Sequence, residues 1–131
     1  MLEQKKAFYS FIQYVHSIER RECVNVGVLI VCPELNWVEF RITDNLERAA
    51  WFFGKDIGWN AERLLKSLAK FAKTLEKAKV SKTFLDKMFA DFFIKTTAGK
   101  HIRMTKLKYT PMLYPELELE GFMRAFVGTP Q

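Results

Sequence analysis

The sequence of 131 residues has no long apolar run. None of its hydrophobic segments approaches the roughly 18 residues that indicate a transmembrane helix. The N-terminal residues are charged, and an alternating pattern follows them instead of the apolar stretch of a signal peptide. These absences predict a cytoplasmic protein that does not associate with a membrane.

Cysteine and histidine are scarce, which argues against a disulfide framework and against a metal site. Cys23 and Cys32 fall at the two ends of one predicted strand, about 30 Å apart at roughly 3.3 Å per residue. That separation is too large for a disulfide between them. His16 and His101 are 85 positions apart, and there is no CxxC motif. We therefore expect two free thiols, no metal and no cofactor.

The motifs of nucleophilic and phosphate chemistry are also missing. No serine lies in a nucleophile elbow, and the segment Gly54–Gly58 lacks the spacing and the Lys-Ser/Thr pair of a phosphate-binding loop. One catalytic hypothesis remains, in which His16 and Glu22 transfer a proton near neutral pH. The alternative is that His16 is a solvated side chain at a strand end. An enzyme is the least supported class.

Large apolar side chains are abundant, with 12 phenylalanines in a chain that is 49% hydrophobic and 27% charged. A chain of this length buries roughly two thirds of the surface that it exposes when unfolded. Each buried aromatic ring removes about 150–250 Å² from water, so aromatic packing should dominate the core. We expect a single domain that spans residues 1–131.

Three segments near the N-terminus have strand patterns. Cys23–Val31 is uncharged and rich in β-branched residues, which is typical of a strand buried on both faces. Phe8–His16 and Trp37–Thr43 alternate between apolar and polar residues, as half-buried strands do. Short turns join the three, so we expect an antiparallel meander with Cys23–Val31 in the middle. Residues 102–109 could add a fourth strand at an edge.

The rest of the chain has helical patterns. Asp44 and Glu47 have the spacing of a capping box for a short helix that ends near Gly54. Asn60 can cap a longer helix, and Ser81 can cap another. The predicted buried residues are Leu64, Leu68, Phe71 and Leu75 in the first of these helices, and Phe84, Leu85, Met88, Phe89 and Phe92 in the second. A short helix should follow Pro115.

These patterns predict an α+β fold. An antiparallel sheet of three or four strands would be covered on one face by the amphipathic helices of residues 60–94. The C-terminal helix would pack alongside.

Basic residues are concentrated in the middle of the chain. Residues 55–108 contain fourteen basic and five acidic side chains, a net charge of +9 in a chain whose total is +6. The charged face of the long helix consists of Lys66, Lys70, Lys73 and Lys77, which Lys79 and Lys82 extend. Four such contacts to duplex phosphates would give a salt slope of about −3.6. The alternative is that lysines simply solvate the outer face of a helix.

The N-terminal half also resembles a known family. The segments Tyr9–Val15 (YSFIQYV) and Arg20–Leu29 (RRECVNVGVL) are similar to the opening of the bacterial and phage family catalogued as domain of unknown function 3037. The segment Arg103–Lys108, followed by Pro115–Glu116 and a helix, resembles its end. Arg21 departs from the pattern, because the family usually has glycine there. The resemblance implies a fold but no activity. Members are sometimes encoded beside HipA-type kinases, which implies a role in partner binding.

Two segments are candidate contact surfaces. The first is the charged turn Arg20, Arg21 and Glu22 with Asn25 nearby, although Asn25 and Gly27 can equally serve the backbone of the sheet. The second is an aromatic segment that contains Trp51, Phe52, Phe53 and Trp59, whose four rings cannot all face inward from one short helix. Trp51, Phe53 and Trp59 are its candidate contact residues. We expect a non-catalytic interaction or regulatory module that binds a protein partner or itself. Nucleic-acid binding through the lysine face is the alternative.

Overall fold

A computed structural model describes residues 3–97, 99 and 101–128. Three strands come first, β1 (Lys5–Ser17), β2 (Glu22–Cys32) and β3 (Trp37–Ile42). The helices α1 (Glu47–Phe53), α2 (Ala61–Val80) and α3 (Lys87–Thr97) follow. Two short strands and a helix end the fold, β4 (Ile102–Met104), β5 (Lys108–Met112) and α4 (Pro115–Phe122). Short helical turns lie at Pro33–Leu35 (η1), Thr83–Leu85 (η2) and Met123–Val127 (η3).

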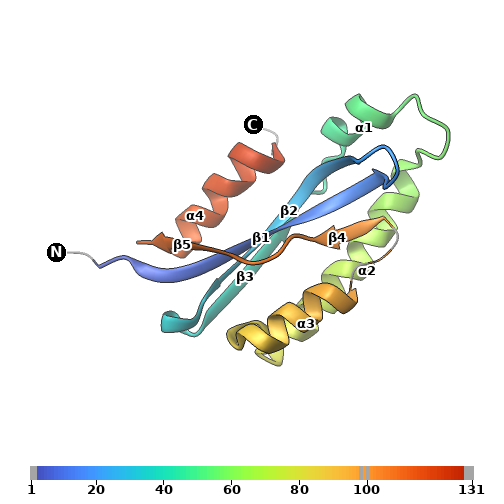
Figure 1. Ribbon diagram of the computed structural model, residues 1–131. Coiled ribbons are helices and arrows are strands. Elements are labelled where there is room, and N and C mark those ends of the chain that lie inside the picture. The colour runs from blue at the N-terminus through green and yellow to red at the C-terminus, as the bar shows by residue number, and fades with distance from the viewer. Residues whose placement is uncertain (1–2, 98, 100, 129–131) are drawn as a thin grey trace.

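The strands form one antiparallel sheet in the order β3-β2-β1-β4, with β5 also paired to β1 (Figure 1). The α+β class and the N-terminal meander predicted from the sequence are confirmed. Strand β2 pairs with β1 on one edge and β3 on the other, which satisfies its backbone on both sides. This position explains why the segment carries no charge.

The predicted fourth strand is two strands, so the sheet has five. Strand β4 pairs with residues 12–14 of β1, and β5 pairs with residues 5–9. Between them, the Thr105 hydroxyl accepts a hydrogen bond from the Phe11 N–H at 2.8 Å. The buried Ser10 hydroxyl donates to the Thr105 carbonyl oxygen at 2.6 Å. Side chains thus take over the hydrogen bonding where the regular ladder stops.

The sheet has a hydrophobic core on each face, which corrects the prediction of one covered face. Helices α2 and α3 lie on one side of the sheet, and α4 lies on the other (Figure 1). We call the core on the side of α2 and α3 the first core and the core on the side of α4 the second core. Leu29 and Val31 of β2 point to the first core, whereas Val28 and Ile30 point to the second. The uncharged run in β2 is therefore buried on both faces, as its composition predicted.

Helix starts were predicted with mixed success. Asn60 caps α2, because its side-chain oxygen accepts from the Arg63 N–H at 2.9 Å. The capping box at Asp44 is wrong: Asn45 accepts from the Glu47 N–H instead, at 2.9 Å. Ser81 ends α2 rather than starting the next helix, and Asp86 accepts from the first N–H groups of α3.

The predicted apolar stripe of α3 is only partly buried. Phe84 is in the core, but Met88, Phe89 and Phe92 are 77%, 62% and 66% exposed. The reason is the extended backbone at Asp86, which interrupts the helical phase between Phe84 and the residues that follow. Helix α3 therefore buries Ala90 and Ile94 instead.

Candidate functional site

The site at the tip of the β1–β2 hairpin begins with a β-bulge at His16. Val15 pairs with Cys23 and Ser17 pairs with Glu22, so His16 is the extra residue on β1. Bulges of this kind change the direction in which a side chain points. Here the bulge lies where the loop between α1 and α2 approaches the hairpin.

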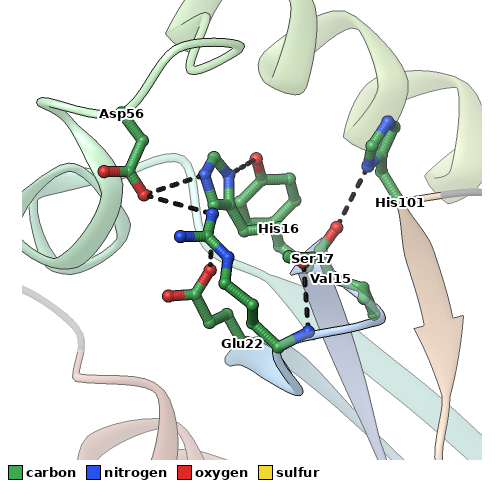
Figure 2. Close-up of polar contacts among 8 residues, drawn as sticks. Val15, His16, Ser17, Glu22, Asp56 and His101 are labelled. Carbon is green, nitrogen blue, oxygen red and sulfur yellow. Dashed lines mark hydrogen bonds and ion pairs between the residues drawn. The ribbon is translucent and has the colours of Figure 1, made fainter.

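The His16 ring is enclosed by three residues from two parts of the chain. Its Nε2 atom lies 3.2 Å from Asp56 Oδ2, and its Nδ1 atom lies 2.7 Å from the Tyr14 hydroxyl (Figure 2). The ring stacks on Phe53 with centroids 4.5 Å apart. Only 6% of the His16 side chain is exposed. The sequence left His16 either as a catalytic residue or as a solvated or singly hydrogen-bonded side chain at a strand end, and the structure places it in a polar cluster with one aromatic wall.

Tyr14 helps to assign the proton positions in this cluster. Burial, and then the negative charge of Asp56, raise the pKa of Tyr14 above its ordinary value of 10.0. Tyr14 is therefore protonated at neutral pH and can donate to Nδ1 of a neutral His16. The ring proton is then on Nε2, which faces Asp56 Oδ2 at 3.2 Å.

Glu22 and Arg20 complete the cluster from the other side of the hairpin. An Arg20 guanidinium nitrogen lies 3.1 Å from Glu22 Oε1 and 3.9 Å from Asp56 Oδ2 (Figure 2). The first distance is that of an ion pair, but the guanidinium N–H is not aligned for a hydrogen bond. Glu22 Oε1 is buried and accepts no hydrogen bond from the part of the chain that the structure describes. The ion pair therefore contributes electrostatic attraction, and Glu22 Oε1 is still able to accept a hydrogen bond.

The cluster brings together two residues that the sequence paired and one that it missed. His16 and Glu22 belong to the same cluster, and its third member is Asp56 from the loop after α1. Ligand atoms of His16, Glu22 and Asp56 all lie within 4.8 Å of one another. Asp56 is 40 positions from His16 in the chain and carries no motif, so no local signal pointed to it. The arrangement can orient a proton and can hold a cation.

The aromatic segment divides between core and surface. Trp51 is 81% exposed, whereas Phe53 is only 5% exposed and supports His16. Trp59 is half-buried against the first core. Phe53 is thus part of the core. Phe52 of the same segment is 58% exposed, and Ile57, which the sequence did not single out, is 102% exposed.

Asn25 and Gly27 serve the sheet and its C-terminal neighbour. A second bulge lies beside them, because Ile12 pairs with Gly27 and Gln13 with Asn25. A Cβ atom on Gly27 would lie 2.5 Å from the Arg41 carbonyl oxygen, so only glycine fits. The Asn25 side chain accepts from Gln13 at 2.9 Å and donates to the carbonyl of Phe126 at 3.3 Å.

Arg21 has the left-handed backbone conformation, with φ of 54°. Glycine adopts this conformation without steric cost. The turn therefore has a shape that suits the glycine usual in the resembling family, although arginine occupies it here.

The predicted lysine face lies along the outer side of α2. Lys66, Lys70, Lys73 and Lys77 are exposed, and Lys66 pairs with Glu62 at 3.5 Å. Lys79 is half-buried and pairs with Glu39 of β3 at 2.6 Å, a hydrogen bond that raises the pKa of Lys79. Lys82 lies past the end of the helix. Two of the six lysines are therefore engaged within the fold.

The fold and the site define a class of protein: an α+β domain with helices on both faces of an antiparallel sheet and a polar cluster at one hairpin tip. A family model described as a protein of unknown function, DUF3037, matches residues 9–127, and the chain belongs to that family. No curated protein and no solved structure gave a significant match. Among the described residues, no helix has both the length and the apolar character needed to cross a bilayer.

Proposed function

We propose that this protein is a non-catalytic module that binds another protein through one corner of its fold. The carrying observation is that Asp56 contacts both His16 and Arg20, at 3.2 and 3.9 Å. Asp56 lies in the loop that follows α1, the helix that carries Trp51, so these contacts link that helix to the charged hairpin turn. Two contact segments inferred separately from the sequence therefore belong to one surface, which we name the hairpin corner (Arg20–Glu22, Trp51, Phe52, Asp56 and Ile57).

The chemistry of the hairpin corner suits a protein partner. Trp51, Phe52 and Ile57 give it an apolar centre, and exposed tryptophan and arginine are common where binding energy is concentrated. Its charges are Arg20 and Arg21 against Glu22 and Asp56, so the two signs balance. A balanced surface does not attract a polyanion, which separates the hairpin corner from a nucleic-acid site.

The module that we propose is cytoplasmic and of bacterial or phage origin, its occupant is a separate protein, and a HipA-type kinase is the first candidate. This candidate comes from the family resemblance. A second copy of the chain is the alternative occupant.

The test is calorimetric titration of the purified protein with a HipA-type kinase, together with sedimentation of each protein alone. Trp51→Ser should weaken binding about 30-fold, as expected for a residue worth about 2 kcal/mol. Phe89→Ser removes another largely exposed ring, from α3, and is the matched control, which should bind normally. If the protein instead dimerises through Trp51, the occupant of the hairpin corner is a second copy of the chain and not the kinase. A chain that binds neither would refute the proposal.

Nucleic-acid binding through α2 is the second candidate. Among the described residues, Lys70, Lys73 and Lys77 form no ion pair and lie on one exposed face. If all three contact duplex phosphates, log Kd should change with log salt at a slope of about 2.7, or about 40-fold between 50 and 200 mM. Fluorescence anisotropy with a labelled duplex measures the slope. Lys70→Gln with Lys73→Gln should reduce it by about 2, and a salt-independent Kd would exclude this role.

A further inference from the structure

We propose that His16, Glu22 and Asp56 form a binding site for one divalent transition-metal ion, which takes the place of the Arg20 guanidinium. The site goes beyond the protein-binding role and does not depend on it. Its three ligands come from three segments: the bulge in β1, the first residue of β2 and the loop between α1 and α2.

The distances between the ligand atoms fit a metal with little movement. His16 Nε2 and Asp56 Oδ2 are 3.2 Å apart. Two ligands bound at about 2.1 Å are separated by about 3.0 Å in octahedral geometry and about 3.4 Å in tetrahedral geometry. All three ligand atoms lie within 4.8 Å of one another, so a side-chain rotation of Glu22 would bring in the third.

The electrostatics of the cluster already favour a cation. Two carboxylates converge on His16, and the Arg20 guanidinium lies between them, 3.1 Å from Glu22 and 3.9 Å from Asp56. Glu22 Oε1 is buried and, within residues 3–97, 99 and 101–128, accepts no hydrogen bond, so a metal ion could occupy this unused acceptor. Arg20 is 64% exposed at a hairpin turn and can move into water without leaving a cavity.

The donor set defines the class of ion. One imidazole nitrogen and two carboxylate oxygens suit Zn²⁺, Co²⁺, Fe²⁺ or Mn²⁺, and three ligands leave further positions for water. Binding through Nε2 moves the ring proton of a neutral His16 to Nδ1, where it is donated to the Tyr14 oxygen 2.7 Å away. A second partner of this kind commonly orients a metal-binding histidine.

The experiment is a titration of the tag-free chain with CoCl₂, followed by visible absorption, and with ZnCl₂, followed by calorimetry. The wild type should bind one equivalent. His16→Ala should weaken binding by about tenfold or more. Arg20→Gln should strengthen binding, because the competing cation is removed. His101→Ala, which removes the second histidine of the chain, should bind as the wild type does.

Further variants distinguish this site from metal binding elsewhere on the chain. Asp56→Asn tests the same site if His16→Ala does not fold, as judged by circular dichroism. Trp51→Ser should retain metal binding, so failure of the protein-binding proposal would not affect this one. Absence of binding by the wild type would overturn the site, as would equal binding by His16→Ala and the wild type. A thiolate charge-transfer band with Co²⁺ would assign the metal to Cys23 and also overturn it.

Discussion

At the scale of single residues, backbone fit and burial account for positions where the sequence looks unusual. Gly27 interrupts an otherwise bulky strand because a Cβ atom would meet the carbonyl of Arg41 on the neighbouring strand. Asn25 sits in the same strand because its amide is bonded on both sides, to Gln13 and to Phe126. These polar or small residues keep the sheet in register.

Gly27→Ala should therefore destabilise the protein. The added methyl would lie 2.5 Å from a backbone oxygen, and the strand must shift to relieve the clash. We expect a loss of about 1–3 kcal/mol in the free energy of unfolding, measured by urea denaturation. Gly121→Ala is the matched control, since a Cβ atom there meets nothing within 4 Å in a helix. That variant should gain about 0.5–1 kcal/mol. Equal effects at the two glycines would contradict the assignment.

Tyr14 should make the stability depend on alkaline pH. Burial and Asp56 raise its pKa in the folded state, so the folded protein retains this proton when the unfolded chain has lost it. Stability from this group is complete below pH 10, the ordinary pKa, and falls as the pH rises further. Urea denaturation at neutral pH and above pH 10 should show a smaller decline for Tyr14→Phe than for the wild type. An identical decline would mean that Tyr14 is not the group responsible.

At the scale of elements, α3 shows how a local interruption changes a buried face. The spacing of Phe84, Met88 and Phe92 predicts one apolar stripe, but the extended backbone at Asp86 puts Phe84 in η2 and the other two in a new helix. Phe84 is 2% exposed, whereas Phe92 is 66% exposed. The apolar period alone could not reveal this, because it does not register the new helix start at Asp86, whose carboxylate accepts from the Met88 and Phe89 N–H groups.

The two phenylalanines should differ in their contribution to stability. Phe84→Ala should lower the free energy of unfolding by about 3–5 kcal/mol, since it leaves a cavity in the first core. Phe92→Ala should change it by less than about 0.5 kcal/mol, because the ring is largely in water. Thermal and urea unfolding of the pair measures both values. A large loss for Phe92→Ala would show that the ring is covered in solution.

At the scale of the whole molecule, the central sheet is tied to helices on both faces. Lys79 of α2 pairs with Glu39 of the edge strand β3, and Glu120 of α4 pairs with Arg41 of the same strand. Two positions of one strand thus connect both layers of helices to the sheet. The prediction of helices on one face overlooked this second layer.

A single domain over residues 1–131 remains a prediction, and unfolding can test it. Leu75 lies in the first core and Leu119 in the second, at 0% and 2% exposure. If the two cores unfold as one unit, Leu75→Ala and Leu119→Ala should each lower a single transition by about 2–5 kcal/mol. Circular dichroism and tryptophan fluorescence should report the same midpoint. Two separate transitions would show two units.

The sequence alone determined the features that depend on neighbours along the chain: the uncharged run Cys23–Val31 in β2, the alternation in β1 and β3, the Asn60 cap and the apolar face of α2. Only the tertiary structure decided the rest. It placed α4 on the far face of the sheet, exposed Met88 and Phe89, and brought Asp56 to His16 and Glu22. The reason is physical: local patterns record which face of an element avoids water, but not which distant element will cover it.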